Sequence, residues 1–152
     1  MTPELRELYQ EVILDHGKRP RNFRTVEAPT HHADGFNPLC GDKVHLKLVV
    51  ERDTIQEAAF LGHGCAISTA SASMMTGLLK GKSVAEGEKL LRSFCDLVVG
   101  TDDEAAAARD EVGKLAVFAG VREYPARVKC AMLGWRTFES ALAQKEEPAS
   151  TE

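Results

Sequence analysis

Two cysteines and an aspartate are spaced so that they meet at one end of a predicted β-hairpin. Cys40 and Asp42 belong to the run NPLCGD, and Cys65 ends the run GHGC. Between these runs, residues 43–50 alternate apolar and polar side chains and residues 55–61 are mainly apolar, which predicts two strands. Strands joined by a short turn pair antiparallel, so the start of the first lies beside the end of the second.

The register of this hairpin decides which side chains meet. If the turn lies at residues 52–54, Leu46 faces Phe60 on the neighbouring strand. Val44 then faces Gly62. Continuing the same register beyond the strands places the first cysteine and the aspartate next to the second cysteine.

Such a cluster is suited to a metal ion. Zinc takes four ligands in a tetrahedron and accepts both thiolates and carboxylates. Cys40, Asp42 and Cys65 supply three ligands, and Cys130 is the obvious candidate for the fourth. The alternative is that Cys40 and Cys65 are small buried apolar residues, which fits poorly because an aspartate and three glycines adjoin them.

The second cysteine of the cluster is also expected at the start of a helix. After Cys65, apolar residues recur at helical spacing at Ile67, Ala70, Met74 and Leu78. The positive end of a helix dipole stabilises a thiolate at this position. The helix is therefore an independent reason to give Cys65 a chemical role.

The other helices are predicted from their N-terminal residues. The starting residues are Thr2 with Pro3, Ser83 with Glu86, Thr101 with Glu104, and Pro125. The helix that Thr101 opens is expected to continue through Phe118 to Gly120. His16, in the last turn of the first helix, is expected to cap that helix or to lie on the surface. An edge strand is expected within residues 27–36.

The composition is that of one ordinary soluble domain. The chain has 152 residues, 43% of them hydrophobic and 28% charged, with a net charge of −4. We expect a single domain over residues 1–144 and a polar tail at residues 145–152. No basic stretch indicates nucleic-acid binding, no apolar run reaches membrane length, and no signal peptide is evident, which predicts a cytoplasmic protein. In that compartment cysteines serve metal binding or catalysis more often than disulfides.

Several further side chains are candidates for the surroundings of the site. His63 stands between two glycines beside Cys65, where it either ligates the metal or hydrogen-bonds a ligand from outside the coordination shell. Lys129, directly before Cys130, is expected close to the ligands. Cys130 lies on the flank of the apolar stripe of the last helix, from which a side chain reaches sideways to a site. Cys95 has no polar neighbours in its helix and is interpreted as an inert packing thiol.

Three motifs taken together resemble a known family. They are NPLCGD, GHGCAIS and RVKCAMLGW, each with one of the three candidate cysteines. In this order they are similar to the U-type iron–sulfur cluster assembly proteins, and in particular to the SufU branch of the SufU/IscU/NifU N-terminal family. The resemblance extends over nearly the whole chain, from residue 9 to the last helix.

The resemblance implies a fold, a metal site and partners. The implied fold is α+β, with helices packed on a three-stranded antiparallel sheet. The implied ligands of zinc are Cys40, Asp42, Cys65 and Cys130, with Cys40 as the sulfur acceptor. The implied partners are a pyridoxal-phosphate-dependent cysteine desulfurase of the SufS kind and an iron–sulfur assembly complex like SufBCD. Such a protein acts as a sulfurtransferase-like carrier of persulfide sulfur.

One departure within the family favours sulfur transfer over cluster assembly. IscU scaffolds place a histidine before the last cysteine, where this chain has Lys129, and carry a chaperone-binding motif that YPARVK replaces here. An extra segment located at residues 98–114 also fits the SufU branch. The alternative is a scaffold that assembles a [2Fe-2S] cluster, or binds iron, on the same residues, because thiolates with one oxygen ligand hold iron as well as zinc.

Overall fold

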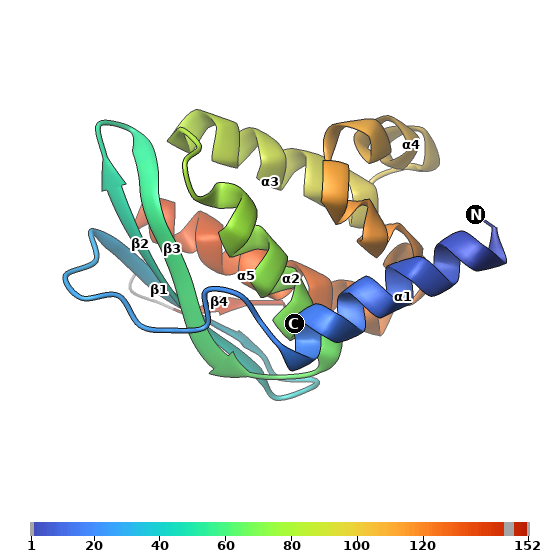
Figure 1. Cartoon of the computed structure of the whole chain (residues 1–152), viewed down its shortest axis with the longest axis horizontal. Coiled ribbons are helices and arrows are strands. Elements are labelled where there is room, and N and C mark those ends of the chain that lie inside the picture. The colour runs from blue at the N-terminus through green and yellow to red at the C-terminus, as the bar shows by residue number, and fades with distance from the viewer. Residues whose placement is uncertain (1, 145–147, 152) are drawn as a thin grey trace.

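The protein is a four-stranded sheet with helices packed on one side of it (Figure 1). The computed structural model describes residues 2–144 and 148–151. In chain order the elements are α1 (Pro3–Lys18), β1 (His31–Asn37), β2 (Asp42–Glu51), β3 (Thr54–His63), α2 (Ala66–Leu79), α3 (Val84–Val99), α4 (Asp102–Glu111), the 3₁₀ helix η1 (Gly113–Glu123), α5 (Pro125–Ala143) and β4 (Ala149–Ser150). Among the helices of the described residues, none is long and apolar enough to cross a membrane.

The central hairpin of β2 and β3 has the predicted register. Leu46 pairs with Phe60 and Val44 with Gly62, as the sequence indicated. Arg52 and Asp53 connect the strands with φ angles of 52° and 62°. Positive φ at both central residues is the geometry of a type I′ turn, whose twist matches that of paired strands. The turn is one residue shorter than expected, because Thr54 already belongs to β3. A register shift between Val49 and Val50 makes up the difference, so turn and bulge together give the predicted pairing near the site.

The sheet differs from the predicted three-stranded antiparallel one. Its strand order is β3-β2-β1-β4, and β4 runs parallel to β1, so the sheet has four strands and is mixed. The short β4 pairs Ala149 with Gly35 and Ser150 with Phe36. Two residues are too few to show an alternating pattern, so this strand could not be predicted from the sequence. Of the expected polar tail, residues 145–147 and 152 lie outside the described residues.

The hydrophobic core lies between the sheet and the helices α2, α3 and α5. Alternate residues of β2 are buried, so one face of the strand contacts the helices and the other is largely exposed. The indole of Trp135 on α5 stacks on Phe94 of α3 with ring centroids 4.9 Å apart, and both side chains are fully buried. This packing fixes α5 against the rest of the molecule, and with it every side chain that α5 presents.

The predicted helix over residues 101–120 is broken in the structure. The capping boxes of Ser83 with Glu86 and of Thr101 with Glu104 are both formed, as expected. However, α4 ends at Glu111 and the 3₁₀ helix η1 begins at Gly113, which has a φ of 56°. This left-handed conformation is accessible to glycine but not compatible with a continuous α-helix.

Helix α1 lies alongside α2 without burying any side chain completely (Figure 1). His16 lies in the last turn of α1 as expected, but it is half-buried and contacts a side chain of α2. Its Nδ1 lies 2.7 Å from the hydroxyl oxygen of Ser73 on α2. The same oxygen accepts a hydrogen bond from the backbone N–H of Arg21 at 2.8 Å. Ser73 therefore links the end of α1 and the loop after it to α2.

Candidate metal centre

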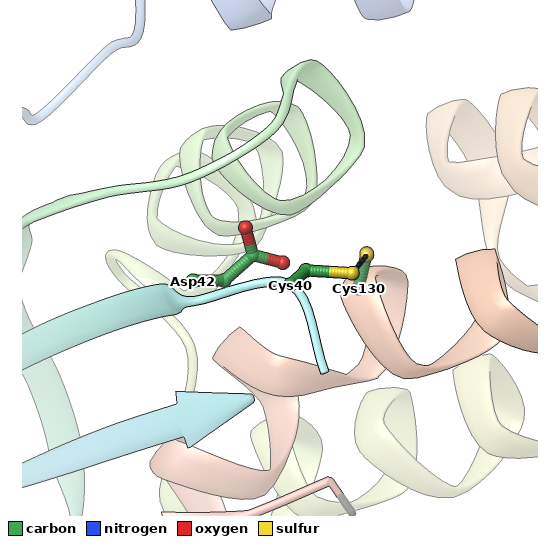
Figure 2. A group of neighbouring side chains, drawn as sticks. All are labelled: Cys40, Asp42 and Cys130. Carbon is green, nitrogen blue, oxygen red and sulfur yellow. Dashed lines mark hydrogen bonds between the residues drawn. The ribbon is translucent and has the colours of Figure 1, made fainter. Parts of the chain in front are cut away.

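Four segments that are far apart in the sequence meet at one end of the sheet. Cys40 lies in the turn between β1 and β2, and Asp42 is the first residue of β2. Cys65 is the N-cap of α2, and Cys130 lies in the second turn of α5. Figure 2 shows the side chains of Cys40 and Cys130 converging next to the carboxylate of Asp42. The hairpin brings Cys40, Asp42 and Cys65 together, as the sequence predicted. The packing of α5 against the sheet brings Cys130 to the same place.

Three of these residues form a compact group of possible ligands. One ligand atom each from Cys40, Asp42 and Cys130 lies within 4.8 Å of the others. The sulfurs of Cys40 and Cys130 are 3.7 Å apart. Cys65 adjoins this group, with its sulfur 3.9 Å from Oδ2 of Asp42. The cluster therefore offers three sulfurs and one carboxylate, the donor set that a tetrahedral zinc ion accepts.

Asp42 is held rigidly in the cluster. Its side chain is 1% exposed, and its Oδ1 accepts a hydrogen bond from the backbone N–H of Cys65 at 3.0 Å. This bond joins the start of β2 to the start of α2. Gly64 makes room for the carboxylate, because a Cβ atom at that position would lie 2.6 Å from Oδ1. The glycine next to Cys65 thus serves the aspartate directly.

Cys65 occupies the predicted position at a helix N-terminus. Its sulfur accepts a hydrogen bond from the backbone N–H of Ser68 at 3.4 Å. An N-cap side chain satisfies a helix N–H group that has no partner within the helix, and the helix dipole favours negative charge there. The local structure therefore directs a backbone N–H at the sulfur of Cys65.

Cys130 is more deeply buried than its flanking position on the helix indicated. Its side chain is 0% exposed, with the sulfur 3.6 Å from the carbonyl oxygen of Ala126. Burial, and then the neighbouring Asp42 and Cys65, raise the pKa of the Cys130 thiol strongly. Acidic groups crowded into one buried place retain their protons unless a positive charge joins them. The cluster therefore fits a bound cation on chemical grounds.

Cys40 is the exposed member of the cluster. Its backbone N–H and that of Gly41 both donate to the carbonyl oxygen of Asn37, at 3.3 and 2.8 Å. Gly41 has a φ of 72° and no neighbouring atom within 4 Å of the position of a Cβ. The turn is thus open to solvent on the side of Cys40.

Comparison with known proteins places the chain in a family. The model of the NifU-like N-terminal domain matches residues 8–144. The chain belongs to this family. Among relatives, the zinc-dependent sulfurtransferase SufU of Bacillus subtilis is 38% identical over 139 residues, covering 91% of this chain and 92% of that protein. The scaffold protein IscU of Streptococcus pyogenes is 37% identical over 139 residues, covering 91% and 85%.

Solved structures agree with this assignment of the NifU-like domain. A putative iron–sulfur cluster assembly scaffold protein for the SUF system, from Fervidobacterium islandicum, superposes with a TM-score of 0.75 at 32% identity. The match covers 90% of this chain and 97% of that one. The resemblance inferred from the three motifs is thus confirmed, and with it the α+β fold of SufU and IscU.

The remaining candidates of the NifU-like domain lie outside the compact group. His63 is exposed at the end of β3, and Lys129 is half-buried at the edge of an open groove with Arg122 and Arg136. Cys95 is partly buried on α3, where burial raises the pKa of its thiol.

Two neighbours of the thiols were not singled out from the sequence. The exposed Arg127 is close enough that the charges of Cys65 and then Cys130 raise the pKa of its guanidinium. Asn37 is fully buried, and its side-chain nitrogen lies 3.8 Å from the sulfur of Cys130. Both residues belong to the motifs that contain the cysteines, and this proximity in the sequence could have identified them as neighbours of the site.

Proposed function

We propose that this protein is a zinc-dependent sulfur-transfer protein of iron–sulfur cluster assembly. It accepts persulfide sulfur from a cysteine desulfurase on Cys40 and passes it to the assembly machinery. Cys40, Asp42, Cys65 and Cys130 hold the zinc ion. The observation that carries the proposal is the unequal exposure of the three thiols in one cluster. Cys40 is exposed, Cys65 partly buried and Cys130 buried, so one sulfur is accessible while the others are anchored.

The transfer is a thiol–persulfide exchange that needs no oxidant. The Cys40 thiolate attacks the terminal sulfur of the desulfurase persulfide, and a new S–S bond forms on Cys40 as the old one breaks. The desulfurase cysteine leaves as a thiolate, which takes up a proton. The Cys40 sulfur is oxidised to the same extent as the desulfurase sulfur is reduced, so no external oxidant or reductant is needed. Zinc at this site supplies positive charge that favours thiolates over thiols. Arg127, exposed beside the thiols, adds a second positive charge near the attacking sulfur.

The surface around Cys40 is suited to a protein partner. Leu39, directly before Cys40, is 65% exposed. An exposed apolar side chain beside the accessible thiol offers a partner an apolar contact at the point of transfer. We assign this face to a pyridoxal-phosphate-dependent desulfurase of the SufS kind. The receiver of the sulfur would be an assembly complex like SufBCD, in the cytoplasm.

A second candidate function is a scaffold for a [2Fe-2S] cluster. The ligand set is compatible with this function, because three thiolates and a carboxylate also bind iron. Relatives named as scaffolds, such as the IscU of Streptococcus pyogenes, are nearly as similar to this chain as the sulfurtransferase is. The two functions differ in what accumulates on the protein, which is sulfur on Cys40 in one case and a coloured iron cluster in the other.

The test compares single cysteine variants in a desulfurase assay. Cys40→Ser should abolish sulfur acceptance, read as the loss of the ~32 Da mass increment of one persulfide sulfur. Cys65→Ser and Cys130→Ser should chiefly lower zinc content. Cys95→Ser is the matched control, because this thiol lies outside the cluster, and it should behave as wild type.

Two results would contradict the proposal. One is full-rate sulfur acceptance by Cys40→Ser with the added mass on Cys130, which would make Cys40 dispensable. The other is wild-type protein that never gains sulfur and instead accumulates an iron cluster when iron and desulfurase are supplied, which would establish the scaffold function.

A further inference from the structure

Asn37 is a fully buried polar residue in contact with most of the candidate metal centre. It is the last residue of β1 and pairs directly with Asp42 across the two strands. Its carbonyl oxygen accepts the backbone N–H groups of Cys40 and Gly41. Its side-chain nitrogen donates toward the sulfur of Cys130 at 3.8 Å. Asn37 thus contacts the turn that carries Cys40, the sulfur of Cys130 and the strand that begins with Asp42.

The side chain of Asn37 also shapes the turn itself. Its Oδ1 accepts the backbone N–H of Leu39 at 3.3 Å, which closes an Asx turn. Together with the two bonds to the carbonyl oxygen, this gives the turn between β1 and β2 a fixed base on Asn37. The position of Cys40 relative to β1 therefore depends on a residue three positions earlier.

The donor from Asn37 reaches Cys130 from the buried side. The carbonyl of Ala126 and the sulfur of Cys40 also lie near this sulfur, but they accept a hydrogen bond only while Cys130 carries its proton. A metal-bound thiolate has no proton to give, so a donor such as the amide of Asn37 is what it needs. Arg127 is exposed and can approach only from solvent.

We propose that Asn37 is a positioning residue of the metal centre. Its amide N–H orients the Cys130 sulfur, and its two oxygens hold the base of the Cys40 turn, so that both sulfurs face the same ion. When Cys40 moves to accept sulfur, a step that rests on the proposed function, Asn37 keeps Cys130 in place and gives the turn a position to return to.

The experiment uses two substitutions at Asn37 and one matched control. Asn37→Asp keeps the shape and the acceptor for Leu39 but removes the donor to Cys130. Asn37→Ser keeps a short acceptor and cannot reach the sulfur, and it buries no new charge. The control is Asn22→Asp, the same chemical change at an asparagine whose Nδ2 bonds Thr76 at 3.3 Å. Thr76 is near the far end of α2 from Cys65.

Three measurements on the whole protein need no desulfurase. Zinc affinity is measured by competition with a chromophoric chelator. The rate at which iodoacetamide modifies Cys40 in zinc-loaded protein is measured by mass spectrometry. The sulfur-to-cobalt absorption band of the cobalt(II)-loaded protein reports the environment of the bound sulfurs directly, which a general loss of stability would not change.

Both Asn37 variants should bind zinc about 10- to 100-fold more weakly, the range found for partners that orient metal ligands. Cys40 should be alkylated faster and the cobalt band should shift, while Asn22→Asp matches wild type. An unshifted band with wild-type alkylation in Asn37→Ser would overturn the proposal and leave Asn37 a packing residue. If these effects appear but wild-type protein accepts no sulfur, the positioning role stands and the proposed function fails.

Discussion

Gly64→Ala tests the metal centre without removing any ligand. The added methyl group would lie 2.6 Å from Oδ1 and 3.0 Å from Cγ of Asp42, where ordinary contacts begin at about 3.4 Å. Asp42 is 1% exposed, so its carboxylate has little free space to move into. To relieve the clash, the carboxylate must move away from the methyl group by several tenths of an ångström. This movement lengthens the hydrogen bond that it accepts from the backbone N–H of Cys65.

The expected size of the effect follows from that hydrogen bond. A bond to a charged carboxylate contributes about 1.5–3 kcal/mol. If the substitution removes it and displaces the carboxylate from the cluster, zinc affinity should fall roughly 10- to 100-fold, since about 1.4 kcal/mol corresponds to a factor of ten. Chelator competition measures the affinity, and thermal unfolding of the metal-free protein measures any separate loss of stability.

Gly77→Ala is the matched control for this substitution. Gly77 lies on the same helix that Cys65 caps, and the nearest atom to its added methyl group is 3.9 Å away, an ordinary contact. This control should bind zinc as wild type does. Wild-type zinc affinity in Gly64→Ala would refute the reasoning, because it would mean that the carboxylate of Asp42 is not needed where the structure places it.

Two further predictions concern stability. Burial lowers the pKa of His16, so its imidazole binds a proton more tightly in the unfolded chain than in the folded one. The folded protein is therefore not penalised above the ordinary pKa of 6.5, and its free energy of unfolding decreases as the pH falls below that value. Thermal unfolding of metal-free protein between pH 5 and 8 should show less acid destabilisation in His16→Gln than in wild type, and equal curves would contradict the assignment. Thr101→Ala removes the capping box with Glu104 and should lower the free energy of unfolding by about 1 kcal/mol, measured by urea titration. No change in the urea midpoint would show that this cap is not needed.

The parts of the fold that were predictable are those whose signals are local. The pairing of the hairpin strands followed from alternation and a short turn, although the bulge between Val49 and Val50 was not foreseen. The capping boxes followed from residue pairs three positions apart. The start of α2 at Cys65 followed from helical spacing. Each of these depends on interactions between residues that are close in the sequence or joined by one tight turn.

The features that could not be predicted depend on contacts between distant segments. The strand β4 exists because Ala149 and Ser150 find the edge of β1, and nothing within those two residues indicates a strand. Cys130 is buried beside Asn37 at the end of β1, a neighbour that is distant in the sequence. The helix break occurs at Gly113, but a glycine within a helical pattern does not by itself end a helix, so the break could not be predicted.

The unequal anchoring of the three thiols is the reason that Cys40 suits the proposed role of carrier. Moving Cys130 out of the cluster would require the second turn of α5 to unwind, because the residue is buried within that helix. Moving Cys65 would remove the cap from the N–H of Ser68 at the start of α2. Cys40 is followed by Gly41, which has a φ of 72° and open space around it, so the turn can change conformation without disturbing a helix or a strand. A carrier must release one ligand and keep the others, and the backbone of this protein makes that distinction among chemically identical side chains.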